Sequence, residues 1–232
     1  MTLAQRLVFP VCLLVGPLLT IVAGTLHPDL AGDGAAQLTI IAQCAAWRAI
    51  HWTFLFSFPL ALVGLVGVAR AHAGTPGENA VRAGLIVGGF AYGAWAVIVA
   101  FMAGAGWSLA QSFTVADAGM TATRAVFLFD MIHPFALASQ RLAGFALGVT
   151  TCLFGWGLLD GERWPRWLGT SALAAGAVAI ALALVFREDT KADQATFVLP
   201  VLWQMVTGAA MLWEGRRAGS AFASEPGLSV RG

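Results

Sequence analysis

The stretch VRAGLIVGGFAYGAWAVIVAFMAG, residues 81–104, contains one charged residue, Arg82, and is otherwise apolar or small. A helix rises about 1.5 Å per residue, so roughly 20 residues cross a hydrocarbon core of about 30 Å. The stretch therefore predicts a membrane-spanning helix. Gly84 and Gly88 lie four positions apart, and small residues at this spacing predict close packing against a neighbouring helix.

Similar stretches recur along the chain of 232 residues, of which 59% are hydrophobic and 11% charged. Soluble domains are about one quarter charged, so this composition indicates that lipid is the main solvent. The apolar stretches lie at 5–24, 50–69, 81–104, 136–159, 166–186 and 196–213. We expect an all-α, polytopic transmembrane helical bundle of about six spans, with one domain over residues 1–214 and a short cytoplasmic tail, 215–232.

The first stretch resembles a signal peptide, because Arg6 precedes an apolar segment. The apolar part is long enough to span, however, and no clear A-x-A cleavage site follows residue 24. We expect a retained first helix.

Lysine and arginine are distributed unequally between alternate connections. With the N-terminus inside, one side holds eight of them: Arg6, Arg70, Arg82, Arg163, Arg166, Arg216, Arg217 and Arg231. The other side holds three: Arg124, Arg187 and Lys191. Because cytoplasmic loops carry an excess of these residues, the distribution predicts that both termini are cytoplasmic.

Charge and cysteine content exclude two other classes. The net charge is +1 and there is no basic run, so nucleic acid is not an expected partner. Cys12, Cys44 and Cys152 lie far apart without C-x-x-C spacing, which excludes a disulfide framework and a thiolate metal site.

Two outer connections are long enough to contain short helices. Residues 35–49 suit an interfacial helix or a re-entrant start of the second span, and residues 119–133 could form another before the fourth span. Pro134 cannot donate a backbone hydrogen bond and disfavours helical geometry at His133. We therefore expect a break at Pro134 rather than one continuous helix.

Charged residues and histidines recur at the same spacing near two spans. WRAIHW places Arg48 and His51 three residues apart, and FLFDMIHPF does the same for Asp130 and His133. If the second and fourth spans are neighbours, Arg48 can pair with Asp130, which would lower the cost of both charges. The sequence leaves Arg124 and Arg141 open as alternative partners.

Two interpretations of these residues remain open. They could cap helices at the outer interface beside an aromatic belt of Trp47, Trp52 and Trp107. Alternatively they line an outward-facing polar pocket, whose candidate residues are Arg48, His51, Asp130, His133 and Arg141. His27, before proline, is expected to be a turn residue or a further member of the pocket. His72, in a cytoplasmic loop, is expected to be solvated.

The leading functional hypothesis is a binding or accessory membrane protein, or a subunit of a larger complex, whose pocket takes a small ligand or cofactor. Haem b or a divalent metal could be held by His51 and His133. The alternatives are a membrane-embedded enzyme that uses Asp130 and His133 as an acid/base pair, and a proton-coupled carrier. Membrane lipid is the expected partner, and partner subunits or further copies of the chain are alternatives.

Three motifs carry a family resemblance: TLHPDL at 25–30, AWRAIHW at 46–52 and GWGLLDGERWPRWLGTSALAAGAVAIALAL at 155–184. Together they resemble a broad group of bacterial, largely actinobacterial, multi-pass membrane proteins classed as a domain of unknown function. The resemblance implies a six-helix fold in the bacterial plasma (inner) membrane. It implies no catalytic residue, and Asp130 and His133 lie outside these motifs.

Overall fold

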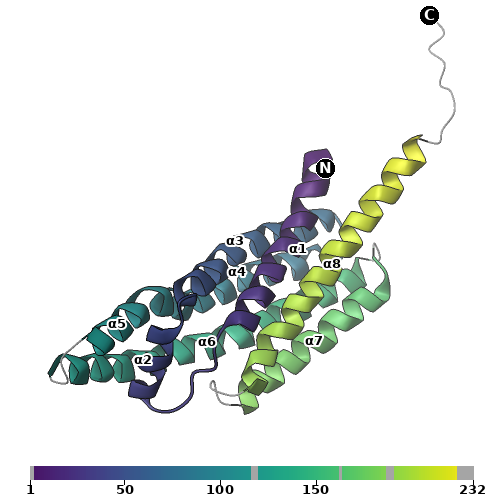
Figure 1. The fold of residues 1–232 in the computed structure, drawn as a ribbon. Coiled ribbons are helices and arrows are strands. Elements are labelled where there is room, and N and C mark those ends of the chain that lie inside the picture. Colours follow the sequence, from purple (N-terminus) through teal and green to yellow (C-terminus); the bar gives the residue numbers. More distant parts are fainter. Residues whose placement is uncertain (1–2, 116–119, 162–163, 187–190, 224–232) are drawn as a thin grey trace, which may run out of the picture.

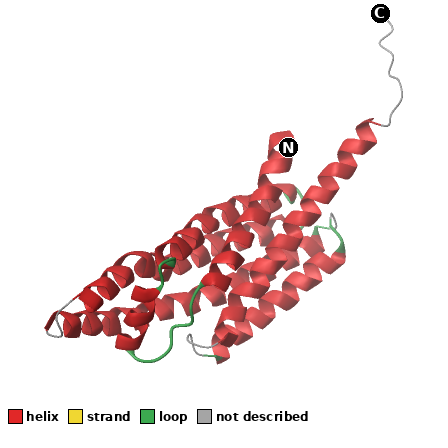
Figure 2. Ribbon diagram, in the orientation of Figure 1, coloured by secondary structure: helices red, strands yellow, loops and turns green. Residues whose placement is uncertain are grey.

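The computed structural model describes residues 3–115, 120–161, 164–186 and 191–223, which form helices joined by short loops and contain no strand (Figure 2). In chain order the helices are α1 (Leu3–Leu26), α2 (Gly34–Gln43), α3 (Trp47–Ala71), α4 (Glu78–Phe101), the π-helix η1 (Met102–Gly106), α5 (Trp107–Val115), α6 (Met120–Asp160), α7 (Arg166–Val185) and α8 (Lys191–Ala223). The predicted all-α class is confirmed.

Six of these helical runs are long and apolar enough to cross a membrane. They are Leu7–Leu26, Trp47–Ala71, Glu78–Val115, Thr121–Asp160, Arg166–Val185 and Gln194–Glu214. Each corresponds to one predicted stretch, so the predicted polytopic bundle is confirmed. The start of α1 and the end of α8 lie at the same end of the bundle, and α2 and α5 lie at the opposite end, which we call the far end (Figure 1).

The helices pack in an order that separates α3 from α6. Helix α3 packs mainly against α1 and α4, α6 packs mainly against α4 and α7, and α8 closes the bundle against α1 and α7. Because α4 lies between them, the second and fourth spans are not the direct neighbours that an ion pair between Arg48 and Asp130 requires.

Glycines allow the spans to approach closely. A Cβ atom on Gly155 of α6 would lie 2.8 Å from the carbonyl oxygen of Gly169 on α7, and one on Gly148 would lie 2.9 Å from that of Gly176. Helices in lipid gain little from the hydrophobic effect, so contacts of this kind carry much of their association. The close packing predicted for α4 is also confirmed, because a Cβ atom on Gly84 would lie 2.9 Å from the Phe154 ring.

Helix α6 corrects the expected break at Pro134. It is one helix of 41 residues with Pro134 inside it, about 61 Å long, which is twice the hydrocarbon thickness. Its first half continues beyond the end of α7 and packs against α5 and α2 (Figure 1). A break was expected because a continuous helix would extend beyond the membrane. The contacts with α5 and α2 at the far end account for the extra length, so a break is not needed. The proline deprives only the Asp130 carbonyl of its usual helical hydrogen bond.

Replacing Gly155 with alanine tests the contact between α6 and α7. We expect Gly155→Ala to lower the free energy of unfolding by about 1–3 kcal/mol, because its Cβ atom would meet the α7 backbone. Thermal unfolding in a fixed detergent measures the change. Gly93→Ala is the matched control, because a Cβ atom at Gly93 has nothing within 4 Å. Equal melting temperatures for the two variants would contradict the packing argument.

Candidate functional site

The five predicted pocket residues do not converge on one point. Arg48 lies exposed and His51 buried in the first turns of α3, whereas Asp130, His133 and Arg141 lie along α6. The ring of His133 stacks on Phe129, with ring centroids 4.6 Å apart, while the ring of His51 contacts residues of α3 and of the loop after α1. The structure thus distributes the candidates over separate local environments.

Arg141 binds the C-terminal end of α7. Its Nε donates to the carbonyl of Ala183 at 2.7 Å, and its Nη2 donates to the carbonyl of Leu184 at 3.0 Å. The last carbonyls of a helix have no partner within the helix and carry partial negative charge. A guanidinium supplies both the N–H donors and the positive charge that these carbonyls favour. Arg141 therefore has a helix-capping role in the structure.

Asp130 lies against the first residue of α2 instead of an arginine. A Cβ atom on Gly34 would lie 2.0 Å from Asp130 Oδ1, so a larger residue there would displace the carboxylate from this place. Within the described residues no ion pair joins Asp130 to Arg48, Arg124 or Arg141, so the predicted pairing is corrected. The N-terminus of a helix carries partial positive charge, which favours a carboxylate at this place.

A double-mutant cycle distinguishes the two explanations of Asp130. We expect Asp130→Asn to lower the free energy of unfolding by about 0.3–1 kcal/mol, the usual magnitude for a carboxylate at a helix N-terminus. Arg48→Gln should change it little, and the two effects should add. Chemical unfolding in detergent measures all three variants. A coupling energy above about 0.5 kcal/mol would restore the predicted ion pair.

Three aromatic rings meet where α1 ends and α3 begins, and we call His27, Trp47 and His51 the histidine cluster. The ring centroids of Trp47 and His51 are 4.3 Å apart, those of His27 and His51 are 5.1 Å apart, and those of His27 and Trp47 are 5.0 Å apart. Trp47 and His51 are almost fully buried. His27, expected as a turn residue or pocket member, thus lies beside His51.

The hydrogen bond of His51 fixes its protonation pattern. Its Nδ1 lies 2.8 Å from the carbonyl oxygen of Trp47, one turn earlier in α3. A carbonyl can only accept, so Nδ1 carries a proton, and in the neutral ring Nε2 then keeps a lone pair. Within the described residues Nε2 forms no hydrogen bond, and it is not one of the fully buried side-chain atoms left without a partner. The buried ring therefore presents one free acceptor nitrogen.

The π-helix η1 holds Trp47 in place. The indole Nε1 of Trp47 donates to the carbonyl of Met102, the first residue of η1, at 2.8 Å. π-helical turns are rare and are often found at functional sites. One of the two interpretations left open by the sequence placed Trp47 in an interfacial belt, but the side chain is fully buried. The glycines Gly104 and Gly106 were the available signal for an irregular helix here.

Burial lowers the pKa of His27 from its ordinary value of 6.5. A hydrogen bond to the Pro28 backbone and the charge of Asp29 act in the opposite direction, but burial is the larger cause. His51 is the other titratable group that faces the ring. The neutral form of His27 is therefore favoured in the folded protein.

This shift predicts the direction of a pH dependence. Because the folded protein binds the proton less readily than the unfolded chain, the contribution of His27 to stability is complete above pH 6.5 and is lost as the pH falls through its lowered folded pKa. We expect the melting temperature, measured with a chelator present, to fall on acidification from neutral pH. His27→Gln should reduce this fall, and an unchanged pH dependence in that variant would contradict the assignment.

His72, at the opposite end of the bundle, corrects another expectation. It was expected to be solvated, but its side chain has no exposed surface. Its Nδ1 lies 2.9 Å from the Val68 carbonyl, and its ring centroid lies 6.0 Å from that of Trp164. Gly161 leaves the necessary room, because a Cβ atom there would lie 2.9 Å from His72 Cδ2. The loop after α3 is therefore packed against the turn between α6 and α7.

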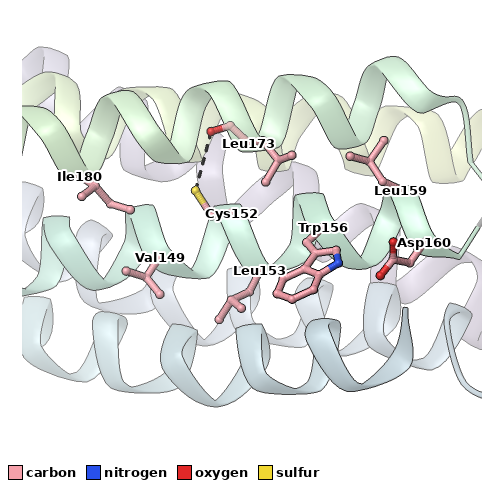
Figure 3. A pocket seen from close by; sticks show the side chains of 8 residues that line it. All are labelled: Val149, Cys152, Leu153, Trp156, Leu159, Asp160, Leu173 and Ile180. Carbon is pink, nitrogen blue, oxygen red and sulfur yellow. Dashed lines mark hydrogen bonds between the residues drawn. The ribbon is translucent and has the colours of Figure 1, made fainter. Parts of the chain in front are cut away.

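A hollow of about 400 Å³ lies between α6 and α7, away from the predicted pocket (Figure 3). Its lining is mostly apolar: Val149, Cys152, Leu153, Trp156, Leu159, Asp160, Leu173 and Ile180. The Cys152 thiol donates to the Leu173 carbonyl at 3.7 Å. None of the five predicted residues belongs to this hollow, and its apolar lining differs from the polar pocket that was expected.

The described residues contain no group of three or more histidine, cysteine, aspartate or glutamate side chains that could hold a metal ion. The histidine cluster is therefore the place where two titratable rings from separate segments meet. Neither a family model nor a curated protein nor a solved structure matches this chain.

Proposed function

We propose that this integral membrane protein binds a small ligand at the histidine cluster, at the far end of the bundle. The observation that carries the proposal is the buried ring of His51, whose Nδ1 is bound to the Trp47 carbonyl while Nε2 remains an acceptor beside His27. His51 Nε2 is not among the fully buried atoms that lack a partner, so a ligand can approach it. A ligand that donates to Nε2 would give this acceptor a hydrogen bond that the described residues do not provide.

The cluster combines acceptor atoms with an apolar surround. His51 and His27 are neutral imidazoles, and the rings of Trp47 and Phe54 lie 4.3 and 6.4 Å from that of His51. Two neutral acceptors suit a ligand that donates hydrogen bonds or carries positive charge. The negative charge of Asp29, which acts on His27, favours the same class of ligand.

The proposed site faces the outside of the cell. Arg70, in the last turn of α3, and Arg82, near the start of α4, flank the connection at the end of the bundle where α1 begins. The excess of basic residues on cytoplasmic loops supports placing this end inside, with both termini cytoplasmic. The far end would then be extracytoplasmic, in the bacterial plasma membrane that the sequence resemblance implies.

A ligand screen against thermal unfolding tests the proposal. The protein in lipid nanodiscs is mixed with primary amines, carboxylates, inorganic phosphate or divalent cations. We expect at least one amine or cation class to raise the melting temperature, because a ligand at 100 times its Kd stabilises the folded state by about 2.7 kcal/mol. The shift should be lost in His51→Phe, which keeps an aromatic ring without the acceptor.

Two further variants complete this experiment. His27 lies half-buried in a loop outside the spans, so His27→Gln gives a second test if His51→Phe does not fold. Gln43→Ala, at the exposed end of α2, is the control that should retain the shift. The proposal fails if none of the classes stabilises the protein, or if the same shift persists in both histidine variants.

A further inference from the structure

One histidine of the cluster is held by the backbone of its own helix. His51 binds the Trp47 carbonyl through Nδ1. Histidines that bind metals commonly donate one ring N–H to a backbone carbonyl, which fixes the ring and leaves the other nitrogen for the metal. The chain thus supplies this supporting arrangement at His51, whose ring lies beside that of His27.

The spacing of the rings fits a shared ion. A metal lies about 2.0–2.1 Å from an imidazole nitrogen, so it lies roughly 3.2 Å from the ring centroid. Two imidazoles bound at a tetrahedral angle then have centroids about 5 Å apart. The centroids of His27 and His51 are 5.1 Å apart, with the rings inclined at 65°. The observed separation therefore leaves room for one ion between the two rings.

We infer that His27 and His51 together bind one divalent transition-metal ion through one ring nitrogen each. This inference rests on the proposed function and names its ligand class. Imidazole nitrogen suits Zn²⁺, Cu²⁺, Ni²⁺ and Co²⁺, whereas Mg²⁺ and Ca²⁺ prefer oxygen. Haem b is disfavoured here, because its porphyrin must stand between two axial imidazoles and rings in contact leave no space for it.

Two protein ligands leave the remaining coordination positions open. No third histidine, cysteine, aspartate or glutamate among the described residues completes the set. Structural zinc sites are closed by four protein ligands, whereas sites that exchange or activate a ligand keep positions for water. The inferred ion is therefore exchangeable, and its other positions are available to water or to a small anion.

Cobalt titration of the purified protein in nanodiscs tests the inference. Co²⁺ alone is the probe, because nitrogen coordination changes its visible absorption, and added Zn²⁺ should displace it. We expect saturable binding of one ion per chain and reversal by a chelator. His27→Gln should weaken the binding at least tenfold, and His51→Gln should do the same. Gln43→Ala should bind as the unchanged protein does, because its side chain lies outside the cluster.

The outcomes distinguish this inference from the proposed function. If His133→Gln, and not His27→Gln, abolishes Co²⁺ binding, the pair of ligands is the one predicted from sequence and the inference is overturned. It is also overturned if Co²⁺ and Zn²⁺ do not bind while an amine still stabilises the protein through His51, and the proposed function then stands. If no class of ligand binds, both fail.

Discussion

A backbone placed in hydrocarbon has no water to bind, and this constraint determines how the polar groups of the bundle are used. Every carbonyl must find a donor within the protein, because an unsatisfied group costs several kcal/mol in lipid. Where a helix departs from regular geometry or ends, a side chain supplies the donor. Trp47 donates to the Met102 carbonyl in η1, and Arg141 donates to the last carbonyls of α7.

The same constraint explains why so few polar side chains remain for chemistry. Several bind the carbonyl one turn earlier in their own helix, namely Thr20, Thr53, Thr150, Thr151 and Thr207. A polar pair also joins two spans, since the Tyr92 hydroxyl donates to Gln204 Oε1 at 2.8 Å. His51 also binds the carbonyl one turn earlier, through Nδ1, but its ring lies beside the ring of a second histidine, His27. Its candidacy as a site rests on that contact.

Much of the fold could be predicted from sequence, because hydrocarbon thickness sets the length of a span and apolar composition marks it. The contacts of Gly84 and Gly88 could be predicted for the same reason, since small residues at helical spacing mark close approach. Whether α6 breaks at Pro134 could not be predicted in this way. A continuous helix is favourable only if its first half packs against other elements, and these elements, α2 and α5, are distant in the chain.

The candidate site was only partly predictable. His51 was identified because an ionisable side chain in an apolar span is costly and usually has a partner. That partner was expected on the fourth span. Which spans adjoin is not encoded in their composition, so Arg48, Arg124 and Arg141 were equal candidates for Asp130. The actual neighbour of Asp130 is the backbone of Gly34, which carries no charge to signal the contact. The burial of Trp47 and His72 could not be predicted, because burial at helix ends depends on the loops that pack there.

The π-helix has a further consequence for the far end. A π turn contains one more residue than an α turn, and each residue rotates the chain by about 100°. The buried face of α5, marked by Ala110, is therefore rotated relative to the buried face of α4. One helical run can thus present one stripe to the membrane bundle and a differently directed stripe to α2 and α6. The angle between the buried faces of α4 and α5 thus depends on the number of residues between them, and a bend in the helix axis is not required.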